Sequence, residues 1–362
     1  MNQEEIMRYV SNGEQLIEAD HEYLQYTGRI NDWDQKAPEF IYPCTSLATV
    51  VTGTTIRVIV SNQRSYWDNY LGCIIDGVEK KFLLPEDGTT TITLAEGLEH
   101  KEHKVLIYKR MDSCHIITIH GLIIDEDATI LKTMEHPKRR MEVYGDSVSA
   151  GEVSEAIEYI GQSDPIHNGE YSNSYYSYSW MTARKLGAEL HTIAQGGIAL
   201  LDKTGWFSGP CYVGLESTYD KIRYNPGLGN LMQWDFTKWT PHVVVVAIGQ
   251  NDAHPVDYMK ANYMSEVSKH WRRHYQMFIE KLRAIYPKAY IILATTILQH
   301  DISWDEAIEE VCGTIQDSKV SHFMYSNNGC GTAGHIRIPE AEQMSEELTT
   351  YINSLGEDIW KD

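Results

Sequence analysis

The segment from Glu142 to Gly151 divides the sequence into two parts that follow different patterns. It begins as an apolar, strand-like run, breaks at Gly145 and brings Ser147 into a tight turn. Ligands of open α/β sheets bind beyond the carboxyl ends of the strands, so this is where such a fold presents a nucleophile. The tripeptide Gly-Asp-Ser is also common in ordinary turns. It therefore indicates a nucleophile only in combination with residues later in the chain.

The part before this segment is rich in short strands. Between about residues 41 and 134, runs of β-branched residues follow one another, among them residues 55–60, 89–94 and 115–124, and Gly, Asn or Asp closes them. This regular spacing, with almost no helical periodicity in between, predicts an antiparallel β-sandwich of the jelly-roll kind. Residues 1–20 carry apolar side chains at roughly helical spacing and predict a short surface helix.

The part after the serine alternates strands and helices. Residues 190–194, 243–248 and 290–294 are strand-like, and the second of these is a continuous apolar run of the kind found in strands buried on both faces. Amphipathic helices are predicted between the strands and at the end of the chain. This alternation predicts a parallel sheet of about five strands with helices on both faces, which is a three-layer α/β/α domain.

The boundary between the two parts is predicted at the polar, proline-containing segment 135–140. It gives an N-terminal β-sandwich domain at residues 1–135 and a second domain at residues 136–362. A chain of 362 residues with 42% hydrophobic content is sufficient to build two cores.

The composition excludes several classes of partner. The chain has 51 acidic and 31 basic residues, a net charge of -20, which argues against nucleic acid or an anionic membrane surface as the main partner. The six cysteines form no Cys-x-x-Cys pair and the histidines show no metal-ligand spacing, so no metal or cofactor is expected. No apolar stretch has the length of a membrane span, and the first residues lack the basic start of a secretory signal. We therefore expect a cytoplasmic protein, or a secreted one if a signal has been removed.

Four loops that follow successive predicted strands carry the parts needed for acyl transfer. They hold Ser147, the glycine pair Gly196 and Gly197, Asn251, and His335. Acyl transfer needs a hydroxyl nucleophile, a base that takes its proton, and neutral donors for the oxyanion. The amide of Ser147, a glycine amide and the Asn251 side chain would supply these donors.

These loops resemble the four blocks of the SGNH hydrolase superfamily. The matching residues are Gly145-Asp146-Ser147 with Gly151, the pair Gly196-Gly197, Gly249-x-Asn251-Asp252, and the late His335. The last block departs from its usual Asp-x-x-His form, because Thr332 stands three residues before His335. With an N-terminal jelly roll, the chain resembles the family 2 carbohydrate esterases, which remove acetyl groups from xylan and related saccharides, in several members with a Ser-His dyad.

The resemblance implies a flavodoxin-like SGNH hydrolase domain in which Ser147 is the nucleophile and His335 is the base. Asn251 and Gly197 would join the Ser147 amide in the oxyanion hole, and Gly196 is the alternative glycine. The implied protein is a serine esterase that removes O-acetyl groups from xylan-derived or related saccharides through an acyl-enzyme intermediate. Its partner would be an acetylated oligosaccharide, and it would need no cofactor.

Because Thr332 replaces the aspartate, another group has to orient His335. A main-chain carbonyl in the segment from Asn328 to Ala333 is the nearest candidate, since it can accept the Nδ1 proton and fix the tautomer. Asp301 and Asp305 on the preceding loop are the carboxylate alternatives.

Trp304 is the candidate substrate-binding residue. It lies between the last two predicted strands, where a wall of the cleft is expected. An aromatic face suits the apolar face of a pyranose ring, although a tryptophan at such a position can equally belong to the core.

Two other functions use the same features. A thioesterase or lysophospholipase would need an apolar acyl tunnel, whereas the loops between residues 170 and 239 are rich in Trp, Tyr, Asn and Ser and favour a polar, shallow site. The other alternative is a saccharide-binding protein in which the jelly roll binds and the hydrolase domain is vestigial.

Overall fold

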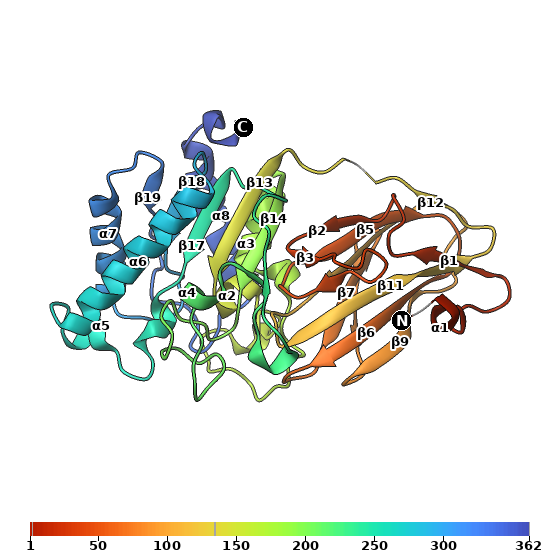
Figure 1. Cartoon of the computed structure of the whole chain (residues 1–362), viewed down its shortest axis with the longest axis horizontal. Coiled ribbons are helices and arrows are strands. Elements are labelled where there is room, and N and C mark those ends of the chain that lie inside the picture. The colour runs from red at the N-terminus through yellow and green to blue at the C-terminus, as the bar shows by residue number, and fades with distance from the viewer. Residues whose placement is uncertain (2, 134, 362) are drawn as a thin grey trace. The chain divides into compact units, whose positions relative to one another are not determined.

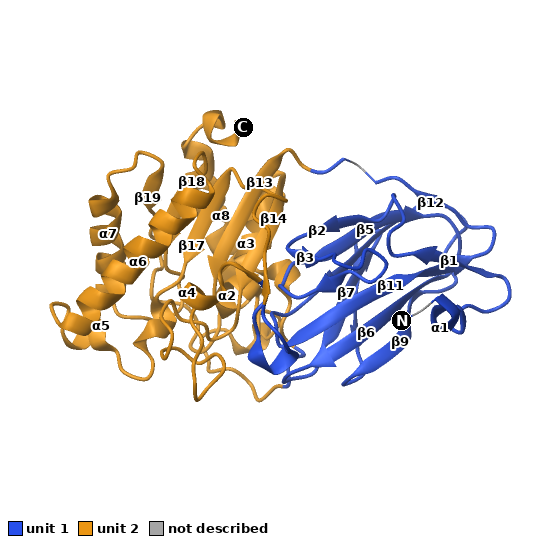
Figure 2. Cartoon of the chain, in the orientation of Figure 1, with its two compact units in different colours: residues 1–136, 168–170, 222–231 blue, residues 137–167, 171–221, 232–362 orange. Residues whose placement is uncertain are grey.

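The computed structural model (Figure 1) describes every residue except Asn2, Met134 and Asp362. The chain divides into two compact units (Figure 2). Unit 1 comprises Met1–His136 together with the short segments Asn168–Glu170 and Ile222–Leu231, and unit 2 comprises the remainder. The two short segments lie in the part of the sequence that was predicted to belong wholly to the second domain. A single boundary in the sequence therefore does not separate the two units.

Unit 1 is an antiparallel β-sandwich, as predicted. Its strands are β1 (Glu14–Glu18), β2 (Gln25–Thr27), β3 (Ile30–Asn31), β4 (Glu39–Phe40), β5 (Ser46–Val51), β6 (Ile56–Arg64), β7 (Tyr70–Ile75), β8 (Val78–Leu83), β9 (Gly88–Ala95), β10 (His103–Lys109), β11 (His115–Asp125) and β12 (Ile130–Leu131). One sheet has the order β3-β4-β11-β6-β9, with β1 also paired to β11. The other has the order β12-β5-β10-β7-β8, with β2 also paired to β5. Val58 and Val60, two residues apart on β6, belong to the buried core, in keeping with the period of a strand.

The helix predicted for residues 1–20 is wrong over most of its length. Helix α1 (Gln3–Met7) is short, and the residues of β1 pair antiparallel with β11. Ile17 belongs to the sandwich core, whereas the adjacent Leu16 packs against a separate apolar cluster that contains Ile6. Adjacent apolar residues thus serve the two faces of one strand, which on a helix would have formed part of a single stripe.

Unit 2 is built on a five-stranded parallel sheet, as predicted. Its strands are β13 (Arg139–Gly145), β14 (Ala188–Ala194), β17 (Val243–Ala247), β18 (Tyr290–Ala294) and β19 (Val320–His322). The order β14-β13-β17-β18-β19 places the second strand in the sequence at one edge beside the first (Figure 1). This is the strand order of flavodoxin-like folds. Every residue of β17 is buried, which explains its unbroken run of apolar side chains.

Helices cover the sheet of unit 2. Helix α3 (Tyr178–Leu186) packs against α8 (Ile338–Ser354), and α6 (Glu266–Ile285), which crosses in front of the sheet in Figure 1, packs against α7 (Ser303–Ile315). The shorter elements of the chain are α2 (Ser147–Ala150), α4 (Leu215–Thr218), α5 (Tyr258–Ala261), β15 (Lys221–Arg223), β16 (Met232–Gln233) and the 3₁₀ turns η1 (Ile157–Tyr159), η2 (Ser174–Tyr176), η3 (Pro226–Leu228), η4 (Gln250–Ala253) and η5 (Glu357–Trp360). Across the described residues, no helix is long and apolar enough to cross a membrane.

Candidate active site

The ends of four neighbouring strands in unit 2 lie level with one another. Gly145 at the end of β13 is paired with Ala194 of β14 and with Ala247 of β17, and Ala247 is paired with Ala294 of β18. Because these strands are parallel, the loops that follow them begin at the same edge of the sheet. The loops with the serine, the glycine pair and the asparagine therefore start side by side.

Ser147 opens the short helix α2 directly after β13. Asp146 is the N-cap of this helix, and its Oδ1 accepts a hydrogen bond from Val148 N at 3.0 Å. Gly151 ends the helix with a φ of 75°, and a Cβ at this position would lie 2.5 Å from Asn173 O, so glycine is required here. The serine is thus held in a turn that its neighbours fix at both ends.

Asp146 also connects the serine turn to the asparagine loop. Its Oδ2 accepts hydrogen bonds from Gln250 Nε2 at 2.6 Å and from Asn251 Nδ2 at 3.1 Å. The side chain is fully buried, and this burial raises the pKa of Asp146 to about 6 despite the donors around it. Asp146 therefore positions two loops of the site relative to each other.

Asp252 makes the corresponding connection to the loop after β14. Its Oδ2 accepts from Leu200 N at 2.8 Å and its Oδ1 accepts from Leu201 N at 3.1 Å. Burial raises the pKa of Asp252 to about 7. On the same loop lies Gly196, which was predicted as the alternative oxyanion donor and whose carbonyl accepts from Gln195 Nε2.

The other predicted oxyanion donors, Gly197 and Asn251, lie on these connected loops. Gly197 has a φ of 71°, and a Cβ there would lie 2.7 Å from Trp206 Cβ, so only glycine fits. Asn251 Nδ2 donates to Ile198 O at 3.1 Å as well as to Asp146. A substrate oxygen would have to replace one of these two acceptors, and the oxyanion roles of both residues stay predictions.

A carboxylate that sequence reasoning missed orients His335. The Nδ1 atom of His335 lies 2.6 Å from Asp164 Oδ2, and Asp164 Oδ1 accepts from Arg337 Nη2 at 2.9 Å. Asp164 comes from the segment between α2 and α3, 171 residues away in sequence. A carboxylate at Nδ1 holds the imidazole in the tautomer whose Nε2 can accept a proton. This is the arrangement of the base and its orienting acid in a Ser-His-Asp triad.

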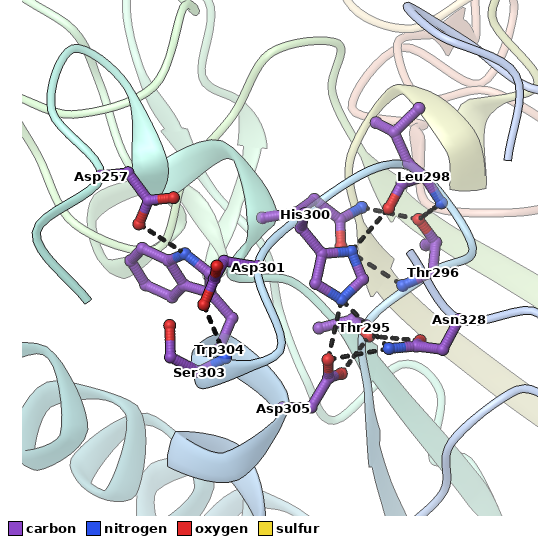
Figure 3. Close-up of polar contacts among 11 residues, drawn as sticks. Asp257, Thr295, Thr296, Leu298, His300, Asp301, Ser303, Trp304, Asp305 and Asn328 are labelled. Carbon is purple, nitrogen blue, oxygen red and sulfur yellow. Dashed lines mark hydrogen bonds and ion pairs between the residues drawn. The ribbon is translucent and has the colours of Figure 1, made fainter. Parts of the chain in front are cut away.

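The three orienting groups expected from the sequence are therefore wrong. Asp301 accepts from Ser303 N at 3.1 Å, and Asp305 lies 2.9 Å from His300 Nε2 (Figure 3). The main-chain carbonyls of residues 328–333 are not the partner either, because the Nδ1 proton already has a carboxylate acceptor. Asp301 and Asp305 instead hold the start of helix α7 and the loop before it (Figure 3).

Trp304 is a core residue, so its predicted role in substrate binding is also wrong. Its side chain is fully buried, and its indole Nε1 donates to Asp257 Oδ1 at 3.1 Å (Figure 3). Its ring packs edge-on against Trp271 with the centroids 5.3 Å apart. Trp304 therefore anchors α7 to its neighbours and presents no face to a ligand.

Trp206, which is exposed, stacks on the half-buried His254 on the loops of the site. Their rings are stacked with centroids 3.4 Å apart, and Trp206 is 60% exposed. Trp206 N donates to Gly197 O at 2.7 Å, and His254 directly follows the 3₁₀ turn that contains Asn251. An aromatic face thus lies where the glycine and asparagine loops meet.

Glu152 flanks the second nitrogen of the His335 imidazole. Its Oε1 lies 3.7 Å from His335 Nε2, and its main-chain N donates to Ser147 O at 3.0 Å. Burial by itself would lower the pKa of His335, but Glu152 and then Asp164 outweigh it and raise this pKa above its ordinary value. Burial likewise would raise the pKa of Asp164, but the hydrogen bonds and charges of His335 and Arg337 hold it below the usual range.

Asp164 and Glu152 carry a weak signal in the sequence. Both follow the nucleophile block closely, and Asp164 precedes Pro165 in a polar segment of the kind that forms loops. No spacing rule relates either residue to His335. Among the residues that the structure describes, no group of three or more His, Cys, Asp or Glu side chains could hold a metal ion.

Thr332, which stands where an aspartate was expected, anchors the segment that carries Asp164. Its Oγ1 accepts from Gly161 N at 2.8 Å, and its own N donates to Glu340 Oε1 at 2.8 Å. The side chain is buried. Thr332 therefore acts on His335 indirectly, through the position of Asp164.

Replacement of this hydroxyl should loosen the Asp164 segment. We expect Thr332→Val to lower kcat about five-fold with little change in KM, since a net hydrogen bond is worth about 1 kcal/mol. Thr332→Ser keeps the acceptor and should retain the wild-type rate. Steady-state kinetics of both variants test this, and equal kcat values for the valine and serine variants would exclude the anchoring role.

Comparison with known proteins agrees with this fold. A family model described as carbohydrate esterase 2 N-terminal matches residues 26–133. Over 355 residues the chain is 27% identical to the cellulase/esterase CelE of Acetivibrio thermocellus, covering 94% of this chain but only 41% of that protein. It is 25% identical over 345 residues to the acetylxylan esterase / glucomannan deacetylase of Cellvibrio japonicus, covering 94% of this chain and 90% of that protein.

A solved structure shows the same fold. The family two carbohydrate esterase from Clostridium thermocellum in complex with cellohexaose superposes with a TM-score of 0.77 at 24% identity, covering 93% of this chain and all of that one. The family model supports the sandwich, and the curated relatives extend the similarity through the hydrolase domain. The β-sandwich of this chain therefore matches the carbohydrate esterase 2 N-terminal model, and the chain as a whole is similar to an acetylxylan esterase.

Proposed function

We propose that this protein removes O-acetyl groups from xylan-derived or related saccharides through an acyl-enzyme intermediate on Ser147. The observation that carries the proposal is the contact of His335 Nδ1 with Asp164, which orients a base at the edge of the sheet where the serine turn lies. The similarity to an acetylxylan esterase / glucomannan deacetylase supports acetylated saccharides as the substrate class.

The proposed reaction uses a triad in place of the dyad that sequence reasoning expected. Ser147 Oγ attacks the acetyl carbonyl while His335 Nε2 takes its proton. His335 then protonates the departing sugar hydroxyl, which leaves an acetyl ester on the serine. A water molecule, deprotonated by the same nitrogen, attacks this ester and releases acetate. Asp164 stabilises the imidazolium that forms in both halves of the reaction.

A comparison of acyl chain lengths tests the proposal. The purified protein should hydrolyse p-nitrophenyl acetate rapidly and p-nitrophenyl octanoate slowly, and it should release acetate from acetylated xylo-oligosaccharides. Preference for octanoate would favour a thioesterase or lysophospholipase. No turnover of any ester would favour the saccharide-binding alternative.

The exposed ring of Trp206 is suited to hold the saccharide. We expect Trp206→Ala to raise KM for acetylated xylo-oligosaccharides about five-fold, because stacking on an aromatic face contributes about 1 kcal/mol. The rate with p-nitrophenyl acetate, which has no sugar ring, should change little. Trp33→Ala is the matched control, since Trp33 is 89% exposed on the β-sandwich. Equal KM values for the Trp206 variant and the wild type would remove this residue from the substrate site.

A further inference from the structure

We propose that Glu152 is a positioning residue for the catalytic histidine, holding the resting imidazole of His335 in its protonated form and so setting the pH above which the enzyme turns over. The proposal rests on the proposed function, because it takes His335 as the base. It assigns distinct roles to two carboxylates on opposite sides of one ring, with Asp164 orienting the ring and Glu152 acting on the nitrogen that takes part in the reaction.

The backbone fixes Glu152 in place beside the nucleophile. The residue follows the left-handed turn at Gly151, and its N donates to Ser147 O. Its side chain is only 8% exposed, and its Oε1 lies 3.7 Å from His335 Nε2. Glu152 thus contacts the backbone of the nucleophile and lies near the very atom of the base that must accept the serine proton.

Other charged groups also face His335. Asp164 lies at Nδ1 and is paired with Arg337, whose Nη1 also donates to His335 O at 2.7 Å. Asp146 acts from the serine turn, where Val148 N and two side-chain amides already bind its carboxylate. Burial lowers the pKa of His335, whereas the charge of Glu152, the hydrogen bond and charge of Asp164 and the charge of Asp146 raise it, and the charge of Glu152 is the largest single one of these favourable contributions.

The placement of Glu152 has a direct consequence for the reaction. His335 Nε2 can accept the Ser147 proton only after it has lost its own proton to solvent. A carboxylate beside Nε2 favours the protonated ring, so this loss occurs at a higher pH than for an isolated imidazole. The rise of kcat/KM with pH should therefore have its midpoint above the ordinary value of about 6.5.

Removal of the Glu152 charge should move this midpoint downward. We expect Glu152→Gln to shift the acid limb of kcat/KM for p-nitrophenyl acetate by about one pH unit toward lower pH. One unit below the wild-type midpoint, kcat/KM relative to its own plateau should then be about five-fold higher in the variant. Glu158→Gln is the matched control, because Glu158 is an exposed residue of the same segment. An acid limb at the same pH in wild type and Glu152→Gln would overturn the proposal.

A direct titration separates this proposal from the proposed function. The His335 imidazole can be titrated by NMR in histidine-labelled protein, with its signal assigned from a His335→Gln variant. We expect the pKa of His335 to fall in Glu152→Gln, and to fall less in Glu152→Asp, which keeps the charge but withdraws it by one methylene. This result would support the role of Glu152 even if no ester were hydrolysed, in which case only the proposed function would fail. If the pKa of His335 is the same in wild type, Glu152→Asp and Glu152→Gln, the proposed role of Glu152 is overturned, whether or not esters are hydrolysed. If Glu152→Gln does not fold, the comparison of wild type with Glu152→Asp decides alone.

Discussion

Asp164→Asn is expected to lower kcat about ten-thousand-fold while KM changes little, as loss of the orienting carboxylate does in a Ser-His-Asp triad. An asparagine amide at this position can donate a hydrogen bond to Nδ1, which favours the tautomer with the proton on Nε2. His335 could then no longer accept the proton of Ser147. The imidazolium would also lose the charge that now lies 2.6 Å from its Nδ1.

Asp301→Asn is the matched control for this experiment. Asp301 was a sequence-based candidate for the same role, but it accepts from Ser303 N and lies 3.6 Å from Lys260 Nζ. Its replacement should leave kcat within a few-fold of wild type. Circular dichroism of both variants checks that they fold, since Asp164 also binds Arg337. A rate within ten-fold of wild type in folded Asp164→Asn would mean that the serine and histidine work as a dyad.

Ser147→Ala should have the largest effect on the reaction, a loss of about a million-fold in kcat, comparable to loss of the nucleophile in other triads. The serine is the first residue of α2 and nearly buried, so an alanine fits its turn without new contacts. Binding of a deacetylated xylo-oligosaccharide should be retained, because the hydroxyl acts only in the bond-forming step. Stopped assays of acetate release, together with calorimetric binding, measure the two effects separately.

Ser149→Ala provides the control two residues further along the same turn. Ser149 Oγ is buried and lies 2.8 Å from Tyr178 OH, so its hydroxyl has a structural partner. We expect this variant to lose about 1 kcal/mol in the free energy of unfolding and to keep its activity. Substantial acetate release by folded Ser147→Ala would show that another group is the nucleophile.

The parts of the fold that depend on local pattern were predictable from the sequence. The unbroken apolar run of β17 indicated a strand buried on both faces, and the alternation of strands and helices indicated the parallel sheet. The register of that sheet then brings the loops with Ser147 and Asn251 to one edge, as the order of the strands required. The spacing of apolar residues and the turn residues that end strands and helices are properties of neighbouring positions, so a single sequence is enough to recognise them.

The parts that depend on the path of a loop were not predictable. Asp164 reaches His335 across 171 residues, and nothing local distinguishes it from other loop aspartates such as Asp301. The same limit explains why Trp304, and not Trp206, was predicted as the aromatic residue of the substrate site. Trp304 is buried and Trp206 is exposed, although both occur on segments that follow strands of the sheet. Exposure is set by the packing of distant segments, and residue type alone does not carry that information.

The separation of Asp164 from the histidine block has an evolutionary consequence. The Asp-x-x-His pattern places its acid at the position of Thr332, whereas here the carboxylate at Nδ1 of His335 comes from Asp164, far away in the sequence. A lineage can exchange one for the other through an ancestor that has both, without passing through an enzyme whose histidine is unsupported. A chain of this fold that lacks the Asp-x-x-His pattern can therefore still hold a carboxylate at Nδ1 of its histidine, and the loop after the serine turn is the place to look for it.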